Sequence, residues 1–295
     1  MAVINPREYY HEQDKRTLDE LTAIPGFTPL LKAFMKVFNE KLLHNVNMAN
    51  KLRLGPKQLP NIYNMLPPIC EKLGIDEPEL YVEMNPIPNA YTYGDTQAFI
   101  TITSGLLDCM TEDEVKTVLA HECGHIACRH VLYHTMASLI LSGASGLVGL
   151  NILSIGLQFA LLHWNRCSEF SCDRAAAVYM QDSKPVISTM MRLAGGGTKN
   201  LIDSMNLGLF MKQADDYSEH IGNSSFNKLL HYYLVKDASH PFLTIRASEI
   251  RKWCKTEQFH RIINYSEGKE DVLCPDCKTL MVDTWKFCRS CGYSV

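Results

Sequence analysis

The segment "VLAHECGHIACRHV", residues 118–131, carries residue types that can bind a metal ion and move a proton. His121 and His125 are four positions apart, so on an α-helix their imidazoles lie one turn above each other and can face one zinc ion. Glu122 follows the first histidine and can take a proton from a metal-bound water and pass it to a leaving amine. This set fits zinc-assisted hydrolysis, although a pattern of three specified residues in five also arises by chance.

A catalytic zinc needs three protein ligands and one open position. The segment "SEFSCDRAA" offers Glu169 and Asp173, which are four apart and share one helical face. We expect Glu169 to be the third ligand and Asp173 to accept a hydrogen bond from a ligand histidine, which fixes its tautomer. His130 and His134 have the same spacing, but both should continue the first helix away from the metal. We interpret them as structural or surface residues.

Local signals predict the elements that position these residues. Thr111 and Glu114 form a Thr-x-x-Glu capping box ahead of apolar residues at helical spacing, so a helix should begin at Thr111. A second helix is expected over residues 154–181. "ELYVEM" and "AFITIT" are rich in β-branched and aromatic residues and predict strands, and "NPIPNAYTYGDTQ" between them predicts a loop, a further strand and a turn.

The N-terminal part is expected to be helical over residues 14–54, and a short helix is expected at Ile69–Leu73. One apolar face is predicted to include Leu31, Phe34, Val37, Phe38 and Leu42. We divide the chain into a helical region (1–68), a domain that carries the H-E-x-x-H motif (69–265) and a cysteine module (270–295).

Residues 60–250, and above all "PNAYTYGDTQAFITITSGLLDCMTEDEVKTVLAHECGHIACRHV", resemble the HtpX-like metallopeptidases of family M48, which are relatives of the CAAX prenyl proteases. These are gluzincins, in which H-E-x-x-H gives two zinc ligands and a later E-x-x-x-D motif, matched here by Glu169 and Asp173, gives the third. The resemblance implies a mostly helical α+β fold of zincin type, with a small antiparallel sheet and an edge strand.

The resemblance also implies substrate contacts. Asn89, Ala90 and Tyr91 lie in the segment similar to the family's edge strand, which pairs with an extended substrate through its backbone. "SHPFLTIRASEI" is similar to the family's H-P…R segment. His240 would then donate a hydrogen bond to the oxyanion of the reaction, and Arg246 would anchor the surrounding network. From the residues alone, the interpretation of His240 as a helix-entry residue before proline is favoured.

Residues 131–165 contain no Asp, Glu, Lys or Arg. Two membrane spans need about 20 residues each and a turn, which this stretch barely provides once the flanking helices take their share. We favour a helical hairpin packed on the domain, with contact to a membrane surface or a partner as the alternative.

Four cysteines near the C-terminus have the spacing of a zinc ribbon, C-x-x-C followed ten residues later by C-x-x-C. They are Cys274, Cys277, Cys288 and Cys291. Four thiolates close a tetrahedral site, so this zinc is expected to be structural, and the module to depend on it for folding. The ribbon is a candidate site for a protein partner. The other seven cysteines are interpreted as small core or helix-face residues in a reducing compartment, which favours a cytoplasmic location, with membrane association as the alternative.

Together these features predict a zinc-dependent endopeptidase, a hydrolase of the metalloendopeptidase class (EC 3.4.24 type), with one catalytic and one structural zinc and a polypeptide substrate. The net charge of −3 gives no reason to expect a nucleic-acid partner. Two alternatives remain open at this point. One is a non-catalytic adaptor that binds protein through its ribbon, and the other is a latent protease that waits for a partner.

Overall fold

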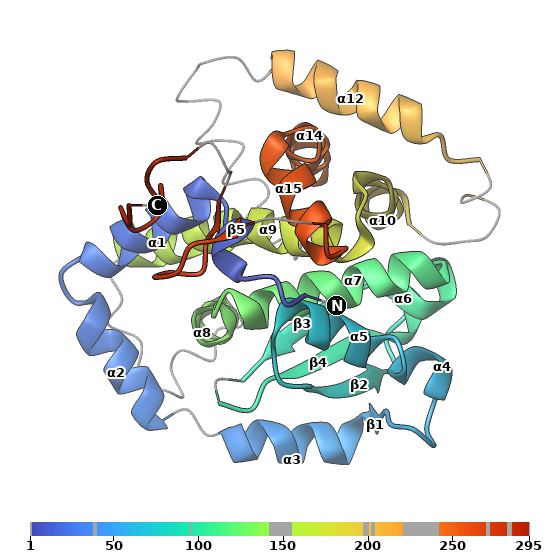
Figure 1. The fold of residues 1–295 in the computed structure, drawn as a ribbon. Coiled ribbons are helices and arrows are strands. Elements are labelled where there is room, and N and C mark those ends of the chain that lie inside the picture. The colour runs from blue at the N-terminus through green and yellow to red at the C-terminus, as the bar shows by residue number, and fades with distance from the viewer. Residues whose placement is uncertain are drawn as a thin grey trace.

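The computed structural model describes residues 2–37, 40–94, 96–141, 155–196, 201, 204–220, 242–269, 272–281 and 285–294 (Figure 1). The described chain is mostly helical, with one four-stranded sheet, so the predicted fold class is confirmed. The helices are η1 (Pro6–Glu8), α1 (Glu12–Ala23), α2 (Phe27–Val37), α3 (Glu40–Asn50), α4 (Pro60–Tyr63), α5 (Leu66–Leu73), α6 (Ser104–Cys109), α7 (Glu112–Ala127), α8 (Val131–Leu141), α9 (Ile155–Met180), α10 (Ser183–Gly195), α12 (Leu207–His220), α14 (Leu243–Trp253) and α15 (Glu257–Ser266).

The sheet contains β1 (Leu52–Arg53), β2 (Glu79–Glu83), β3 (Ala90–Tyr93) and β4 (Phe99–Thr103) in the order β1-β2-β4-β3. The three predicted strand segments are therefore confirmed. The sheet is mixed rather than antiparallel, because β4 lies between β2 and β3 and runs parallel to β2. This order leaves β3 at one end of the sheet, beside α7.

Helices α7 and α9 pack against each other at the centre of the molecule (Figure 1). The predicted capping box starts α7: Thr111 accepts a hydrogen bond from the backbone of Glu114, whose carboxylate accepts one from the backbone of Thr111. Close approach of the two helices requires Gly124, because a Cβ there would lie 2.9 Å from the Cβ of Ala175 and 3.0 Å from the Cα of Cys172.

Helices α8 and the first part of α9 come from the uncharged stretch and pack against each other. Residues 142–154 of that stretch lie outside the described residues. The two helices share a second apolar core with the N-terminal helices, through Phe27, Phe34, Met136, Leu161 and Trp164. In the part of the chain that the structure describes, no helix is long and apolar enough to cross a membrane.

The expected apolar face of residues 31–42 is only partly correct. Phe34 is fully buried, whereas Leu42 is 61% exposed, because α2 ends at Val37 and α3 begins a new direction at Glu40. The side chains of Val37 and Phe38 lie outside the described residues.

Two short strands, β5 (Val272–Leu273) and β6 (Leu280–Met281), belong to the cysteine module. The module packs on the N-terminal segment, where Leu280 N donates to Glu8 Oε1 at 3.0 Å, and on α15, where the guanidinium of Arg261 lies 5.3 Å from the ring centre of Trp285.

Candidate metal centre

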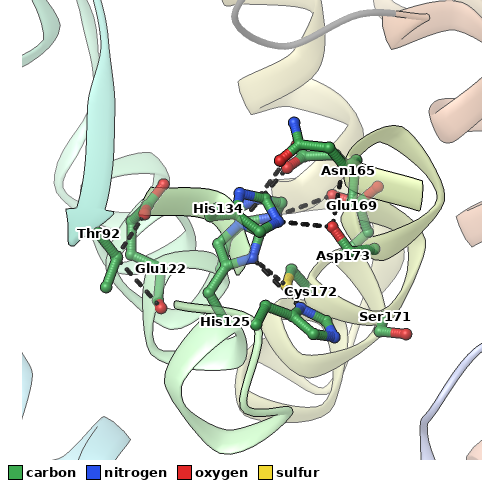
Figure 2. Close-up of polar contacts among 12 residues, drawn as sticks. Thr92, Glu122, His125, His134, Asn165, Glu169, Ser171, Cys172 and Asp173 are labelled. Carbon is green, nitrogen blue, oxygen red and sulfur yellow. Dashed lines mark hydrogen bonds and ion pairs between the residues drawn. The ribbon is translucent and has the colours of Figure 1, made fainter. Parts of the chain in front are cut away.

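Helices α7 and α9 bring together the H-E-x-x-H and E-x-x-x-D residues (Figure 2). His121 Nδ1 lies 3.1 Å from Asp173 Oδ1, so the ionised carboxylate accepts the Nδ1 proton and directs Nε2 toward Glu169. That Nε2 atom lies 3.4 Å from Glu169 Oε2. Asp173 therefore stands behind His121, on the side away from Glu169.

His125 approaches the same glutamate, with its Nε2 atom 3.4 Å from Glu169 Oε1. Zinc ligands with bonds of 2.0–2.1 Å in a tetrahedral arrangement lie about 3.3 Å apart. One group of described residues that could hold a metal joins the two histidines to Cys172. Each imidazole nevertheless lies at a ligand-to-ligand distance from one oxygen of Glu169, as expected for ligands His121, His125 and Glu169. All three side chains are at least nine-tenths buried, so the ion would bind in a pocket of low dielectric.

Arg246 of α14 joins the two carboxylates of α9. Its guanidinium donates to both oxygens of Asp173, at 2.8 and 2.6 Å, and lies 2.8 Å from Glu169 Oε2. Burial opposes ionisation of Asp173, but Arg246 outweighs it and holds the pKa of that carboxyl below its usual range. Arg246 thus contacts both acids, and its role in the site stays a prediction.

The pocket remains favourable for a cation despite the arginine. Burial would lower the pKa of His121, but hydrogen bonds and charges from Asp173 and Glu169 outweigh it and raise that pKa to about 10. A strongly negative surrounding of this kind also suits a divalent metal.

Glu122 lies on the sheet side of α7, where Figure 2 shows its carboxylate turned toward Thr92 of β3. The Thr92 hydroxyl donates to Glu122 Oε2 at 2.6 Å. Because Thr92 is buried, this bond fixes one carboxylate oxygen and leaves the other for a proton. The sequence did not single out Thr92; its position two residues after Ala90 on the predicted strand was the available signal.

The expected substrate strand is β3 with the residue before it. Thr103 N donates to Asn89 O at 3.0 Å, so Asn89 and, by alternation, Tyr91 direct their backbone groups to β4. Ala90 and Thr92 then point their backbone N–H and C=O groups to the opposite side, where no strand follows in the described sheet. The Tyr91 side chain is engaged elsewhere, with its hydroxyl on Glu83.

His130 and His134 do not continue α7, contrary to the expectation from sequence. The helix ends at Ala127, and Arg129 adopts a φ of +60°, which reverses the chain into α8. His130 Nδ1 thus lies 3.4 Å from His125 Nδ1, and the ring of His134 is 4.3 Å from that of His125, centre to centre. Cys172 Sγ is also close, 3.2 Å from His125 Nδ1.

The ribbon cysteines converge at the C-terminal end of the described chain, and all four lie close enough together to hold one metal ion. Cys274 Sγ lies 3.6 Å from Cys291 Sγ, and Cys277 Sγ lies 3.5 Å from Cys288 Sγ. Thiolates 2.3 Å from a tetrahedral zinc are about 3.8 Å apart, so the sulfur positions fit such a site. Every cysteine in the chain is free.

Comparison with known proteins agrees with this geometry. The model of Peptidase family M48 matches residues 56–254. The chain belongs to peptidase family M48. One relative is the plastoglobule-localized metallopeptidase 48, chloroplastic, of Arabidopsis thaliana, which is 31% identical over 90% of this chain and 77% of its own length.

Other M48 relatives are named Protease HtpX homolog. The one from Pelotomaculum thermopropionicum is 29% identical over 44% of this chain and 46% of its own length. The one from Helicobacter pylori is 28% identical over 60% of this chain and 61% of its own length. The chain thus spans about half of these HtpX homologues. M48 metallopeptidases are zinc enzymes, and the described residues include His/Cys groups able to bind a metal.

His240, the expected oxyanion donor, lies outside the described residues.

Proposed function

We propose that this M48 protein is a zinc-dependent endopeptidase that cleaves extended or unfolded polypeptide. The observation that carries the proposal is the convergence of His121, His125 and Glu169 beside a Glu122 carboxylate that Thr92 orients toward the edge strand. A zinc ion held by these three ligands would supply an activated water and polarise the scissile carbonyl.

The chain's own residues would perform the proton transfers. Glu122 accepts a proton from the attacking water and delivers it to the leaving amine, so the same carboxylate acts as base and then as acid. Asp173 keeps His121 in the tautomer that directs Nε2 to the metal, and Arg246 holds Asp173 and Glu169 together. His240 remains our candidate for the donor to the developing negative charge on the carbonyl oxygen.

The substrate would bind as an additional strand. The outward backbone groups of Ala90 and Thr92 offer donors and acceptors to an extended peptide, which would lie antiparallel or parallel to β3 near Glu122. An apolar pocket adjoins His121 and Glu122 and is lined in part by Leu106, Val186 and Met190. We therefore propose cleavage beside an apolar side chain, with the backbone providing most of the contact.

The remaining assignments are proposals of the same kind. We propose one catalytic zinc and one structural zinc in the ribbon, with the ribbon available to a protein partner. The three-part division into 1–68, 69–265 and 270–295 is kept as an organisational proposal, although Ile4 and Tyr9 pack into the main core. The free cysteines favour a reducing compartment such as the cytoplasm. The name of the plastoglobule-localized relative adds a lipid surface as a candidate location, where the hairpin of α8 and α9 would be the contact.

Digestion of unfolded casein by the purified chain and by its Glu122→Gln variant tests the proposal, with fragments read by mass spectrometry. We expect the wild type alone to cleave, next to apolar residues, while the variant retains its zinc. Equal cleavage by both proteins would refute the role of Glu122. Two bound zincs and no cleavage by either protein would favour a latent enzyme or a binding protein.

A further inference from the structure

The N-terminal helix α1 runs beside α9 (Figure 1) and carries Asp14. Asp14 is fully buried. Its Oδ1 atom accepts a hydrogen bond from Trp164 Nε1 at 3.1 Å, and its Oδ2 atom accepts one from the Ser171 hydroxyl at 2.5 Å. Asp14 lies outside the segment that the M48 family model matches, residues 56–254. A buried carboxylate with this many partners needs an explanation beyond helix packing.

The remaining partner of Asp14 is a histidine. His130 Nε2 lies 3.0 Å from Asp14 Oδ2, and both side chains are fully buried. The ionised carboxylate only accepts hydrogen bonds, so the proton of this contact sits on His130 Nε2. In a neutral imidazole the other nitrogen, Nδ1, then carries a lone pair and acts as an acceptor.

That acceptor faces a proposed zinc ligand. His130 Nδ1 lies 3.4 Å from His125 Nδ1, and two facing nitrogens attract only when one of them carries a proton. Because His130 Nδ1 is the acceptor, His125 carries its proton on Nδ1. The lone pair of His125 is therefore on Nε2, the atom that faces Glu169.

Two carboxylates would thus fix the tautomers of the two ligand histidines. Asp173 contacts His121 directly, whereas Asp14 acts on His125 through the ring of His130. The Cys172 sulfur lies 3.2 Å from His125 Nδ1 and 3.6 Å from His130 Nδ1. It can accept from the protonated His125 Nδ1 and donate its own S–H to the His130 Nδ1 lone pair, so this proton arrangement also satisfies the thiol.

We propose that Asp14 and His130 are positioning residues for the metal centre, forming a relay from α1 to His125 that fixes its tautomer and ring orientation. The proposal rests on the proposed metal centre of His121, His125 and Glu169. It makes the N-terminal segment part of the site rather than an appended helical region.

The test measures zinc affinity by competition with a chelator in the full chain. A His121→Ala, His125→Ala double variant retains only the ribbon zinc and defines that contribution. Asp14→Asn keeps side-chain volume and His130→Phe keeps a planar ring, but both break the relay, and we expect each to weaken catalytic-site zinc binding about 10- to 100-fold. Thr17→Val is the matched control, because Thr17 is buried on the same helix and its hydroxyl donates to backbone carbonyls of α1 and contacts the thiol of Cys167, outside the proposed relay.

A conservative variant separates positioning from packing. Glutamine at position 130 has an amide oxygen for the His125 proton and an amide N–H for Asp14, so His130→Gln should recover most of the zinc affinity that His130→Phe loses. If the role were purely structural, every variant would instead lower the unfolding temperature, and by the same amount in the zinc-free and the zinc-loaded form. If Asp14→Asn fails to fold, the contrast between His130→Phe and His130→Gln still decides the question.

Two results would overturn the relay. One is zinc affinity in Asp14→Asn and His130→Phe within about threefold of the Thr17→Val control. The other is a third zinc per wild-type chain that disappears in His130→Phe, which would make the grouping of His125, His130 and His134 a metal site itself. Failure of the proposed function gives a different result: the wild-type chain would lack the catalytic zinc, or the Glu122→Gln variant would still cleave casein.

Discussion

Gly124 offers a direct way to change the spacing between the two helices that carry the proposed zinc ligands. It lies between Glu122 and His125 on α7, and α9 passes so close that an added Cβ would be 2.9 Å from the Cβ of Ala175 and 3.0 Å from the Cα of Cys172. Carbon atoms in ordinary contact are about 3.5–4.0 Å apart. Gly124→Ala should therefore separate α7 from α9 by about half an ångström, because a backbone atom cannot rotate away.

The energetic cost combines two opposing effects. Overpacking of a core costs about 1–3 kcal/mol, whereas alanine is favoured over glycine in a helix by about 0.8–1.0 kcal/mol. The net loss of unfolding free energy should be about 0–2 kcal/mol, which corresponds to a fall in Tm of at most roughly 8 °C. The same displacement moves His125 relative to Glu169, so zinc should be lost faster to a chelator.

Thermal unfolding and chelator-driven zinc release measure the two effects. Gly156→Ala is the matched control, since Gly156 also lies in a helix but a Cβ there meets nothing within 4 Å. We expect this control to leave Tm unchanged or slightly higher and zinc release unchanged. If Gly124→Ala behaves like Gly156→Ala in both assays, the close packing of α7 on α9 does not position the ligands.

Three further substitutions test other parts of the account. Arg246→Met should lower the unfolding free energy by about 3–5 kcal/mol in urea titrations, because it leaves two buried carboxylates without their cation. The control Arg251→Met removes a surface ion pair and should cost under about 1 kcal/mol. Equal losses in the two variants would contradict a buried role for the Arg246 pair. Thr92→Val should reduce kcat about 10- to 100-fold with zinc content unchanged, since Glu122 loses a charged hydrogen bond, and an unchanged kcat would refute its orienting role. Thr111→Ala should cost about 1 kcal/mol in the same titrations through loss of the helix cap, and no loss would mean that the cap is redundant.

Local sequence patterns were sufficient for the elements nearest the metal centre. The Thr111 capping box predicted where α7 begins, and the spacing of four residues within each helix placed His121 above His125 and Glu169 above Asp173. These inferences succeed because helix periodicity and capping depend on neighbours within one turn. The contact between the two helices came from the family resemblance and from the requirement for a third ligand.

Contacts between distant segments could not be predicted in this way. The turn at Arg129 contains no glycine or proline, so no local sequence signal marks it. His130 and His134 were therefore predicted to continue the first helix away from the metal. Asp14 meets Ser171 across 157 positions of the sequence, and no local pattern encodes such a pairing. The parallel alignment of β2 with β4 was missed for the same reason, because strand order depends on tertiary packing rather than on the strands' own residues.

The most direct test of the central claim is a crystal structure of the purified chain with anomalous diffraction collected at the zinc edge. The account predicts two zinc peaks. One should lie within bonding distance of His121 Nε2, His125 Nε2 and a Glu169 oxygen, with Glu122 and Thr92 beside it, and the other among Cys274, Cys277, Cys288 and Cys291. A peak confined to the ribbon, or a second peak held by other side chains, would contradict the proposed metal centre.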